Sequence, residues 1–222
     1  MSKQGKVILK TLFERLLFLP LDINNPPLDY TDYLMEVKKE GKWQDKYRNC
    51  AHTPVMYNYK DKKVFDWTPH GKQMPKLQQW FEDVWFPIAG RSRIVVINTI
   101  TQEENPPHID CSIKKFDTLQ HKFRYVMQGN VNDLEFIGKE QSVRPDEIDK
   151  PFIMCGKWPH KMKNRTDRTK LTLAFGAPWD GDLDDNKYYK LLEKSYSKYN
   201  SHYLGMNLSL PDNYETLFEE SV

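Results

Sequence analysis

Short apolar segments follow one another closely in the second half of the chain and predict strands. Residues 93–100 (RIVVINTI) are β-branched and apolar, as in a buried strand, and residues 122–128 (KFRYVMQ) alternate between polar and apolar side chains. Four further strands are expected, over 108–113, 134–137, 151–155 and 170–175. Short strands separated by polar turns favour antiparallel pairing in a sandwich or a barrel.

Helical patterns lie on both sides of this β-rich segment. Residues 75–86 place Leu77, Trp80, Phe81 and Val84 at three- and four-residue steps, which predicts a helix. The other expected elements are helices over 29–39 and 188–203 and strands within 47–60 and 64–67. Residues 6–19 fit either an amphipathic helix or an opening strand plus a turn.

These patterns predict a single domain over residues 1–222. It would have N-terminal helical and strand elements over 1–90, a β core over 91–180, and a C-terminal helix and tail over 181–222.

Composition narrows the class of protein. Hydrophobic residues make up 39% of the chain and charged residues 29%, as in a folded globular protein. The apolar start of the chain is interrupted by Lys10, Glu14 and Arg15, so we expect neither a signal peptide nor a transmembrane segment. The three cysteines form no CxxC pair, which argues against a disulfide framework or a structural zinc site. We therefore expect a soluble cytoplasmic protein without a membrane partner, and its net charge of +2 does not require a nucleic acid partner.

Three residues suggest a metal site. His108 and Asp110 are two positions apart at the start of a predicted strand, so both side chains would point to one face. His160 follows a later strand, whose end can return to this pair in a folded sandwich. Two imidazoles and one carboxylate suit Fe(II) and leave coordination positions open. Each residue also has an ordinary interpretation, as a surface histidine, a turn residue and a member of a basic loop.

A basic residue on the strand after His160 could bind a carboxylate. Arg168, Lys170 and Thr172 would share one face of a strand that begins at residue 168, and arginine is favoured because its guanidinium binds both carboxylate oxygens. The alternatives are that the basic run over 157–170 is a solvated face, or that Lys161, Lys163 and Arg165 contact nucleic acid.

Segments around these residues resemble a known family. The segments NPPHIDCSI (105–113), KFRYVMQG (122–129) and WPHKMKNRTDRTKLTLAFGAPW (158–179) resemble the core of Fe(II)/2-oxoglutarate-dependent dioxygenases, over roughly residues 93–180. The ending Ala177-Pro178-Trp179 is most similar to the aspartyl/asparaginyl β-hydroxylase branch, although that branch often lacks the carboxylate ligand, which here is Asp110.

The resemblance implies a mainly β fold with flanking helices around a double-stranded β-helix, the jelly-roll core also found in cupins. It implies His108, Asp110 and His160 as Fe(II) ligands, with Arg168 as the arginine that binds the cosubstrate. Arg124 matches a second cosubstrate-binding arginine of the branch, and Lys170 and Thr172 lie on the same predicted strand face as Arg168.

The resemblance further implies an oxidoreductase that consumes 2-oxoglutarate and O2, releases succinate and CO2, and hydroxylates a C–H bond. A peptide or protein side chain is the favoured substrate, while nucleic acid and small metabolites stay open. Two other interpretations are kept: a non-catalytic cupin-like β-sandwich binding module, and a zinc or manganese cupin that acts without 2-oxoglutarate.

Overall fold

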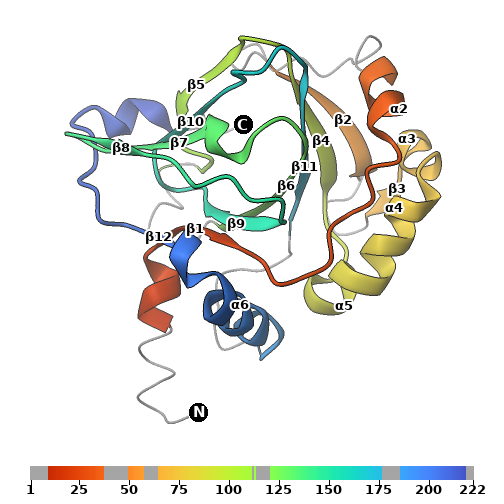
Figure 1. Cartoon of the computed structure of the whole chain (residues 1–222), viewed down its shortest axis with the longest axis horizontal. Helices are drawn as coiled ribbons and strands as arrows, with labels where there is room; N and C mark the ends of the chain where they lie inside the picture. Colours follow the sequence, from red (N-terminus) through yellow and green to blue (C-terminus); the bar gives the residue numbers. More distant parts are fainter. Residues whose placement is uncertain are drawn as a thin grey trace.

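Two antiparallel β-sheets and a set of flanking helices make up the computed structural model (Figure 1), which describes residues 10–37, 50–57, 65–111, 113, 121–176 and 186–218. The larger sheet has the strand order β12-β1-β9-β6-β11-β4-β2-β3, and the smaller sheet has the order β5-β10-β7-β8.

The strands of the larger sheet, in chain order, are β1 (Leu16–Pro20), β2 (Cys50–Tyr57), β3 (Asp66–Trp67), β4 (Ile94–Thr99), β6 (His121–Gln128), β9 (Phe152–Cys155), β11 (Lys170–Phe175) and β12 (Leu204–Gly205). Those of the smaller sheet are β5 (Glu104–His108), β7 (Leu134–Ile137), β8 (Ser142–Val143) and β10 (His160–Lys163). The α-helices are α2 (Thr31–Val37), α3 (Pro69–Lys72), α4 (Pro75–Trp80), α5 (Phe86–Ala89) and α6 (Asn186–Tyr199). Single turns of other helix types are η2 (Phe81–Trp85), η4 (Val131–Asp133), η5 (Asn200–His202) and η6 (Tyr214–Leu217).

Between β4 and β11 the chain passes repeatedly from one sheet to the other. It crosses from β4 to β5, returns to β6, crosses to β7 and β8, and then visits β9, β10 and β11 in alternating sheets. Side chains of both sheets meet in one buried cluster, which includes Phe18 and Phe152 from the larger sheet and Phe136 from the smaller. The two sheets therefore face each other across a shared interior.

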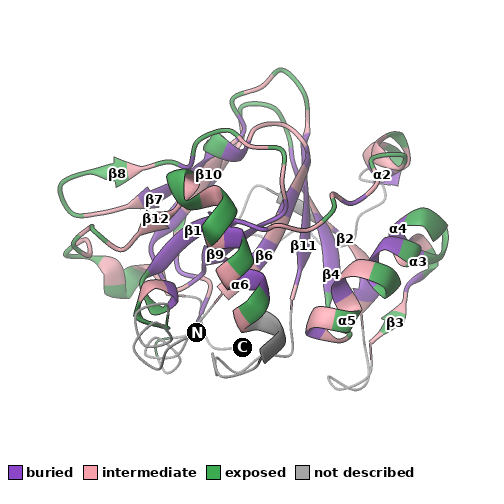
Figure 2. Ribbon diagram, turned by 60° about the horizontal axis from the view of Figure 1, so that its bottom comes forward, coloured by how far each residue is buried: buried purple, intermediate pink, exposed green. Residues whose placement is uncertain are grey.

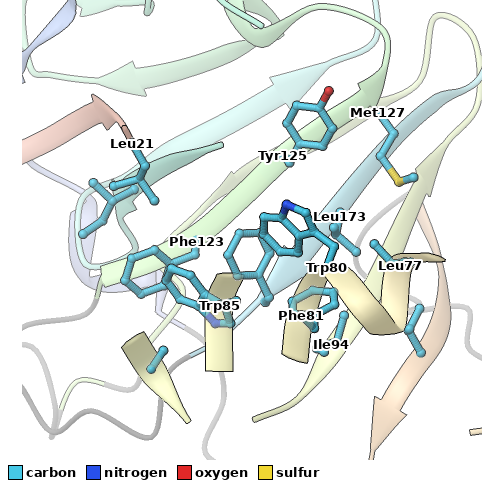
Figure 3. Close-up of a cluster of buried hydrophobic side chains, with 14 of the residues drawn as sticks. Leu21, Leu77, Trp80, Phe81, Trp85, Ile94, Phe123, Tyr125, Met127 and Leu173 are labelled. Carbon is cyan, nitrogen blue, oxygen red and sulfur yellow. The ribbon is translucent and has the colours of Figure 1, made fainter. Parts of the chain in front are cut away.

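The opposite face of the larger sheet is covered by helices. Aromatic side chains of the segment from α4 to α5 pack on β6 and β11 (Figure 3), and Trp85 lies 4.7 Å from Phe123 and 4.8 Å from Phe175 between ring centroids. The indole of Trp85 donates a hydrogen bond to the carbonyl of Gly176 at 3.1 Å, so this large side chain is buried with its polar group satisfied. Figure 2 shows the buried residues concentrated on the central strands, with α6 exposing one face.

Alternation along β11 separates these two environments. Leu171, Leu173 and Phe175 belong to the cluster beneath the helices. Lys170, Thr172 and Ala174 must then point to the interior between the sheets, because successive side chains of a strand point to opposite faces.

The strands expected over 93–100, 122–128, 134–137, 151–155 and 170–175 are confirmed to within one residue at each end. The helix expected over 75–86 continues to Ala89 and consists of α4, one π-helical turn and α5. Pro87 has no amide hydrogen, so regular α-helical bonding cannot continue through it. Helices α2 and α6 lie where the pattern placed them, and residues 16–20 form a strand after a helical turn that begins by Lys10.

One strand prediction was wrong and one strand was not predicted, both at positions that matter for the site. The strand expected over 108–113 ends at His108 and begins at Glu104, so it contains Pro106 and Pro107. Proline is tolerated there because β5 is an edge strand of the smaller sheet, where one side of the strand needs no amide donor. His160 follows β9, as expected, but it begins a further strand, β10, which its polar sequence had not indicated.

Among the described residues, no helix has the length and apolar character needed to cross a bilayer. The Ala177-Pro178-Trp179 segment of the family resemblance lies outside the described residues.

The aromatic cluster predicts a large stability contribution from Phe175, which is 2% exposed and contacts Trp80, Phe81 and Trp85. We expect Phe175→Ala to lower the free energy of unfolding by about 3–5 kcal/mol, because it removes a ring and leaves a cavity. Denaturant unfolding measures this change. Leu28→Ala is the control, since Leu28 is 45% exposed and its loss should cost no more than about 0.5 kcal/mol. Equal effects of the two substitutions would contradict the packing described here.

Candidate metal centre

His108, Asp110 and His160 converge in the interior between the sheets. One possible ligand atom from each lies within 4.8 Å of the others. His108 Nε2 is 3.4 Å from Asp110 Oδ1, and His160 Nε2 is 3.7 Å from Asp110 Oδ2. Their side chains are between 6% and 13% exposed, so the group is shielded but reachable.

Strand pairing brings the two histidines together. His108 is the last residue of β5 and lies directly opposite His160, the first residue of β10. Side chains opposite each other in an antiparallel pair are neighbours, and here the ring centroids are 4.4 Å apart. Asp110 follows two residues beyond β5, where its amide donates a hydrogen bond to the carbonyl of Gly156 at 2.7 Å.

Backbone carbonyls orient both imidazoles. Nδ1 of His108 lies 2.7 Å from the carbonyl of Pro106, and Nδ1 of His160 lies 2.8 Å from that of Trp158. Because a carbonyl can only accept, each Nδ1 carries a proton, and in the neutral tautomer each Nε2 has the free lone pair that a metal ligand needs. Histidine ligands of metals are commonly fixed in this way.

The protonation states also suit a metal site. Burial, together with the charge of His108, lowers the pKa of His160 to about 3, so this imidazole is neutral at ordinary pH. Burial alone would raise the pKa of Asp110, but the hydrogen bond from His108 and the charges of His160, His108 and Lys122 hold it well below its usual value. The buried His160 and the ionised Asp110 therefore give a neutral nitrogen and a carboxylate, and with the imidazole of His108 they form a donor set with the mixed character that Fe(II) accepts.

Arg124 lies beside the carboxylate. It projects from β6, and its guanidinium Nη2 is 3.7 Å from Asp110 Oδ2, while Nη1 donates a hydrogen bond to the carbonyl of Phe123 at 3.0 Å. Of the residues expected to bind the cosubstrate, Arg124 is the one that the structure places against the triad.

A polar strip runs from this point along the larger sheet. Arg124 pairs with Ala174 of β11, Thr172 lies two residues back on the same face, and Lys170 a further two. Thr99 of β4 is directly opposite Lys170. The hydroxyl oxygens of Thr99 and Thr172 are buried and have no hydrogen-bond partner within the part of the chain that the structure describes. Such groups are costly unless a ligand or water satisfies them, so they mark this strip as a binding surface.

Lys170 is the cation of this strip. It is 1% exposed, and its ammonium donates to Asp133 Oδ2 at 3.0 Å and to the carbonyl of Asn130. Burial lowers its pKa, while Asp133 opposes that shift. Asp133 also interacts through Oδ1 with Arg165 at 3.4 Å, and Arg165 approaches Glu135, which binds Arg144 at 2.6 Å. The charge of Glu147 also acts on Lys170, so three carboxylates and three cations make up this cluster.

Arg168 is not on the strand that was expected to carry it. Strand β11 begins at Lys170, and Arg168 lies exposed in the loop before it. The cause is the fully buried amide of Asn164, which donates to the carbonyl of Arg168 at 2.6 Å and to that of Thr99 at 3.0 Å. The carbonyl of Arg168 is thereby tied to the end of β4, and the strand starts at Lys170 and not at Arg168.

The basic run is also less free than its sequence suggests. Lys161 lies 3.3 Å from Glu104, and Arg165 forms ion pairs with Asp133 and Glu135.

The sequence patterns did not point to three polar residues of this site, Thr99, Asp133 and Asn164. Thr99 could have been found as a polar residue at the end of an apolar strand. Asp133 lies in the short turn η4 and Asn164 in a loop, where the sequence has no periodic pattern.

Comparisons with known proteins add no close relative. No known protein-family model and no curated protein matches the chain. Among solved structures, the chain is similar to a prolyl-4-hydroxylase from Pseudomonas putida, with 10% identity, a TM-score of 0.45, and coverage of 78% of this chain and 99% of that one. It is also similar to a prolyl hydroxylase from Trichoplax adhaerens in complex with a hypoxia inducible factor peptide fragment, with 13% identity, a TM-score of 0.44, and coverage of 84% and 98%. A third is a 2OG-Fe(II) oxygenase family oxidoreductase from Burkholderia pseudomallei, with 8% identity, a TM-score of 0.39, and coverage of 68% and 79%. Likeness at this level does not assign a function, so the assignment depends on the site.

The geometry predicts that His160 is needed for metal binding. We expect His160→Ala to weaken Zn²⁺ binding, measured by titration calorimetry, by more than the roughly 10–100-fold that loss of an outer partner of a metal ligand costs. His202→Ala is the control, because His202 lies in η5 and has Ser201 and Tyr199 as neighbours. Unchanged affinity in the His160 variant would exclude this centre.

Proposed function

We propose that the protein is a non-haem Fe(II)/2-oxoglutarate-dependent dioxygenase. The observation that carries this proposal is the buried His108-Asp110-His160 group at one end of a polar strip that holds Lys170 and two unsatisfied threonine hydroxyls. A ligand that binds a metal at one end and presents a carboxylate at the other would satisfy both parts, and 2-oxoglutarate has this structure.

His108, Asp110 and His160 would hold the metal and leave coordination positions for the cosubstrate and O2. Bound there, Fe(II) supplies the oxidation in which 2-oxoglutarate and O2 give succinate, CO2 and a hydroxylated substrate C–H bond. Arg124 holds Asp110 in place and adds positive charge beside the carboxyl end of the cosubstrate. The surrounding sheets exclude water from this interior.

Lys170 is the proposed anchor of the distal carboxylate, in place of Arg168. It is buried on the interior face, and Asp133 and Asn130 hold its ammonium group. Thr172 and Thr99 donate their hydroxyls to the same carboxylate, which gives both buried oxygens a partner. The distal carboxylate would add a further partner for the Lys170 ammonium, next to Asp133.

We also assign the two facing sheets to a double-stranded β-helix core within one domain over residues 1–222. The larger sheet contains the order β4-β11-β6-β9, and the smaller sheet has the order β5-β10-β7-β8. Successive strands along the chain alternate between the two sheets, as the winding of a double-stranded β-helix requires, and this supports the assignment.

A peptide or protein side chain is the proposed substrate. Nucleic acid is disfavoured because Lys161 and Arg165, which were candidates for phosphate contacts, form ion pairs with carboxylates of the protein. A cytoplasmic location remains our expectation.

The assignment of the cosubstrate anchor predicts that Lys170→Met weakens binding of 2-oxoglutarate by about 10–100-fold, as expected for loss of a hydrogen bond to a charged group. The measurement is anaerobic calorimetry with Fe(II) present. Arg168→Met is the matched control and should bind normally. Because Lys170→Met also removes one of the two cations that face Asp133, Thr172→Val provides a milder test that retains the shape of the side chain. It should weaken binding several-fold, on the order of 1 kcal/mol. A loss confined to the Arg168 variant would contradict this anchor.

The proposed activity predicts that the protein forms succinate from 2-oxoglutarate only when both Fe(II) and O2 are present. His108→Ala should abolish this turnover, and addition of a correct peptide should increase it. A pool of peptides and a pool of oligonucleotides, compared in the same assay, identify the substrate class. Fe(II) binding without any succinate formation, with or without these pools, would instead favour the non-catalytic binding module.

A further inference from the structure

A segment far along the chain reaches the metal centre. Residues 206–218, here called the strap, leave strand β12 and run along the turn between β7 and β8 to the end of β5 (Figure 1). The strap begins where the amide of Met206 donates to the carbonyl of Arg15 at 2.7 Å. Along its course the amide of Lys139 donates to the carbonyl of Ser209 at 2.8 Å.

Apolar contacts hold the strap against the protein. Met206, Leu208 and Leu210 pack against the buried cluster between the sheets. A side chain on Gly138 would meet Leu208 at 3.0 Å, so the strap lies directly on the β7–β8 turn. The strap is therefore attached along its length and not only at one point.

The strap ends on the backbone between two of the proposed metal ligands. The amide of Ile109 donates to the carbonyl of Leu217 at 2.7 Å, and Ile109 forms a parallel β-bridge with Phe218. Ile109 is fully buried and follows His108 directly, at the point where β5 stops pairing with β10. The strap thus binds the edge strand where it gives way to the loop that carries Asp110.

Two successive amides of this loop are fixed by different parts of the protein. The amide of Ile109 is held by Leu217, and the next amide, that of Asp110, is held by Gly156. Fixing both peptide groups sets the direction in which the Asp110 side chain leaves the backbone relative to His108. Loss of the bond to Leu217 removes one of these two constraints on the loop.

We propose that the strap positions His108 and Asp110 for metal binding, with the carbonyl of Leu217 as the positioning group. This inference rests on the proposed metal site. Groups that orient metal ligands typically change metal affinity by about 10–100-fold when they are removed.

The direct test is a pair of truncations. A chain that ends after Asn213 lacks Leu217 and Phe218, whereas a chain that ends after Phe218 keeps both and is the matched control. We expect the shorter chain to bind Zn²⁺ about 10–100-fold more weakly than the control in calorimetric titration. Affinities within twofold of each other, in proteins with the same circular dichroism spectrum, would overturn the proposal.

A measurement on the full chain decides the matter if the shorter chain does not fold. Coupling is reciprocal, so if the strap favours metal binding by a given factor, the metal must favour the docked strap by the same factor. Zn²⁺ should therefore slow hydrogen exchange of the Thr216 amide, which bonds to the carbonyl of Asn213 within the strap. The amide of Lys72 in α3 is the control and should not respond.

The outcomes separate the two claims. If the full chain binds Zn²⁺ but exchange at Thr216 is unchanged, the positioning role is wrong and the metal site stands. If the full chain binds no Zn²⁺, the metal site itself is wrong, and the strap has no ligand to position.

Discussion

The antiparallel pairing of β5 with β10 is the constraint on which the candidate site depends. It places His108 opposite His160, at a separation that a single metal ion can bridge. A slip of one residue in this register would send one of the imidazoles to the other face of the sheet, because the side-chain period of a strand is two. The backbone carbonyls of Pro106 and Trp158 then fix the rings, and the loop after β5 brings Asp110 between them.

The larger sheet separates an apolar core, which lies under the helices, from a polar interior, which faces the smaller sheet. Its helix-covered face holds a continuous aromatic core around Trp85 and Phe175. Its other face carries Arg124, Thr172 and Lys170 toward the smaller sheet, where buried polar groups would be unfavourable in a purely structural core. The ion pair of Lys170 with Asp133 reduces that cost, and a bound anion would reduce it further. A protein with no ligand for this face would be expected to fill it with apolar side chains.

Much of this arrangement followed from local sequence patterns. Apolar and β-branched runs predicted the positions of β4, β6 and β11 correctly. The two-residue spacing of His108 and Asp110 correctly predicted that their side chains lie close together. The strand itself was misplaced, because Pro106 and Pro107 normally argue against a strand, and only its edge position allows them. The choice between Arg168 and Lys170 could not be made from sequence. It depends on the side chain of Asn164, which bonds to the carbonyl of Arg168 nearby and to that of Thr99, 65 positions away, so that β11 starts at Lys170. The strap was equally hidden, since its bond to Ile109 joins residues more than a hundred positions apart.

The central claim is that one interior holds both an iron centre and a site for the far carboxylate of 2-oxoglutarate. Its most direct test is the visible absorption spectrum of the full chain under anaerobic conditions, recorded as Fe(II) and then 2-oxoglutarate are added. The account predicts that a charge-transfer band appears only when both are present, and that succinate, which lacks the keto group needed for chelation, does not produce it. Binding of Fe(II) and of 2-oxoglutarate without such a band would show that the two do not meet at one centre, and would contradict the account.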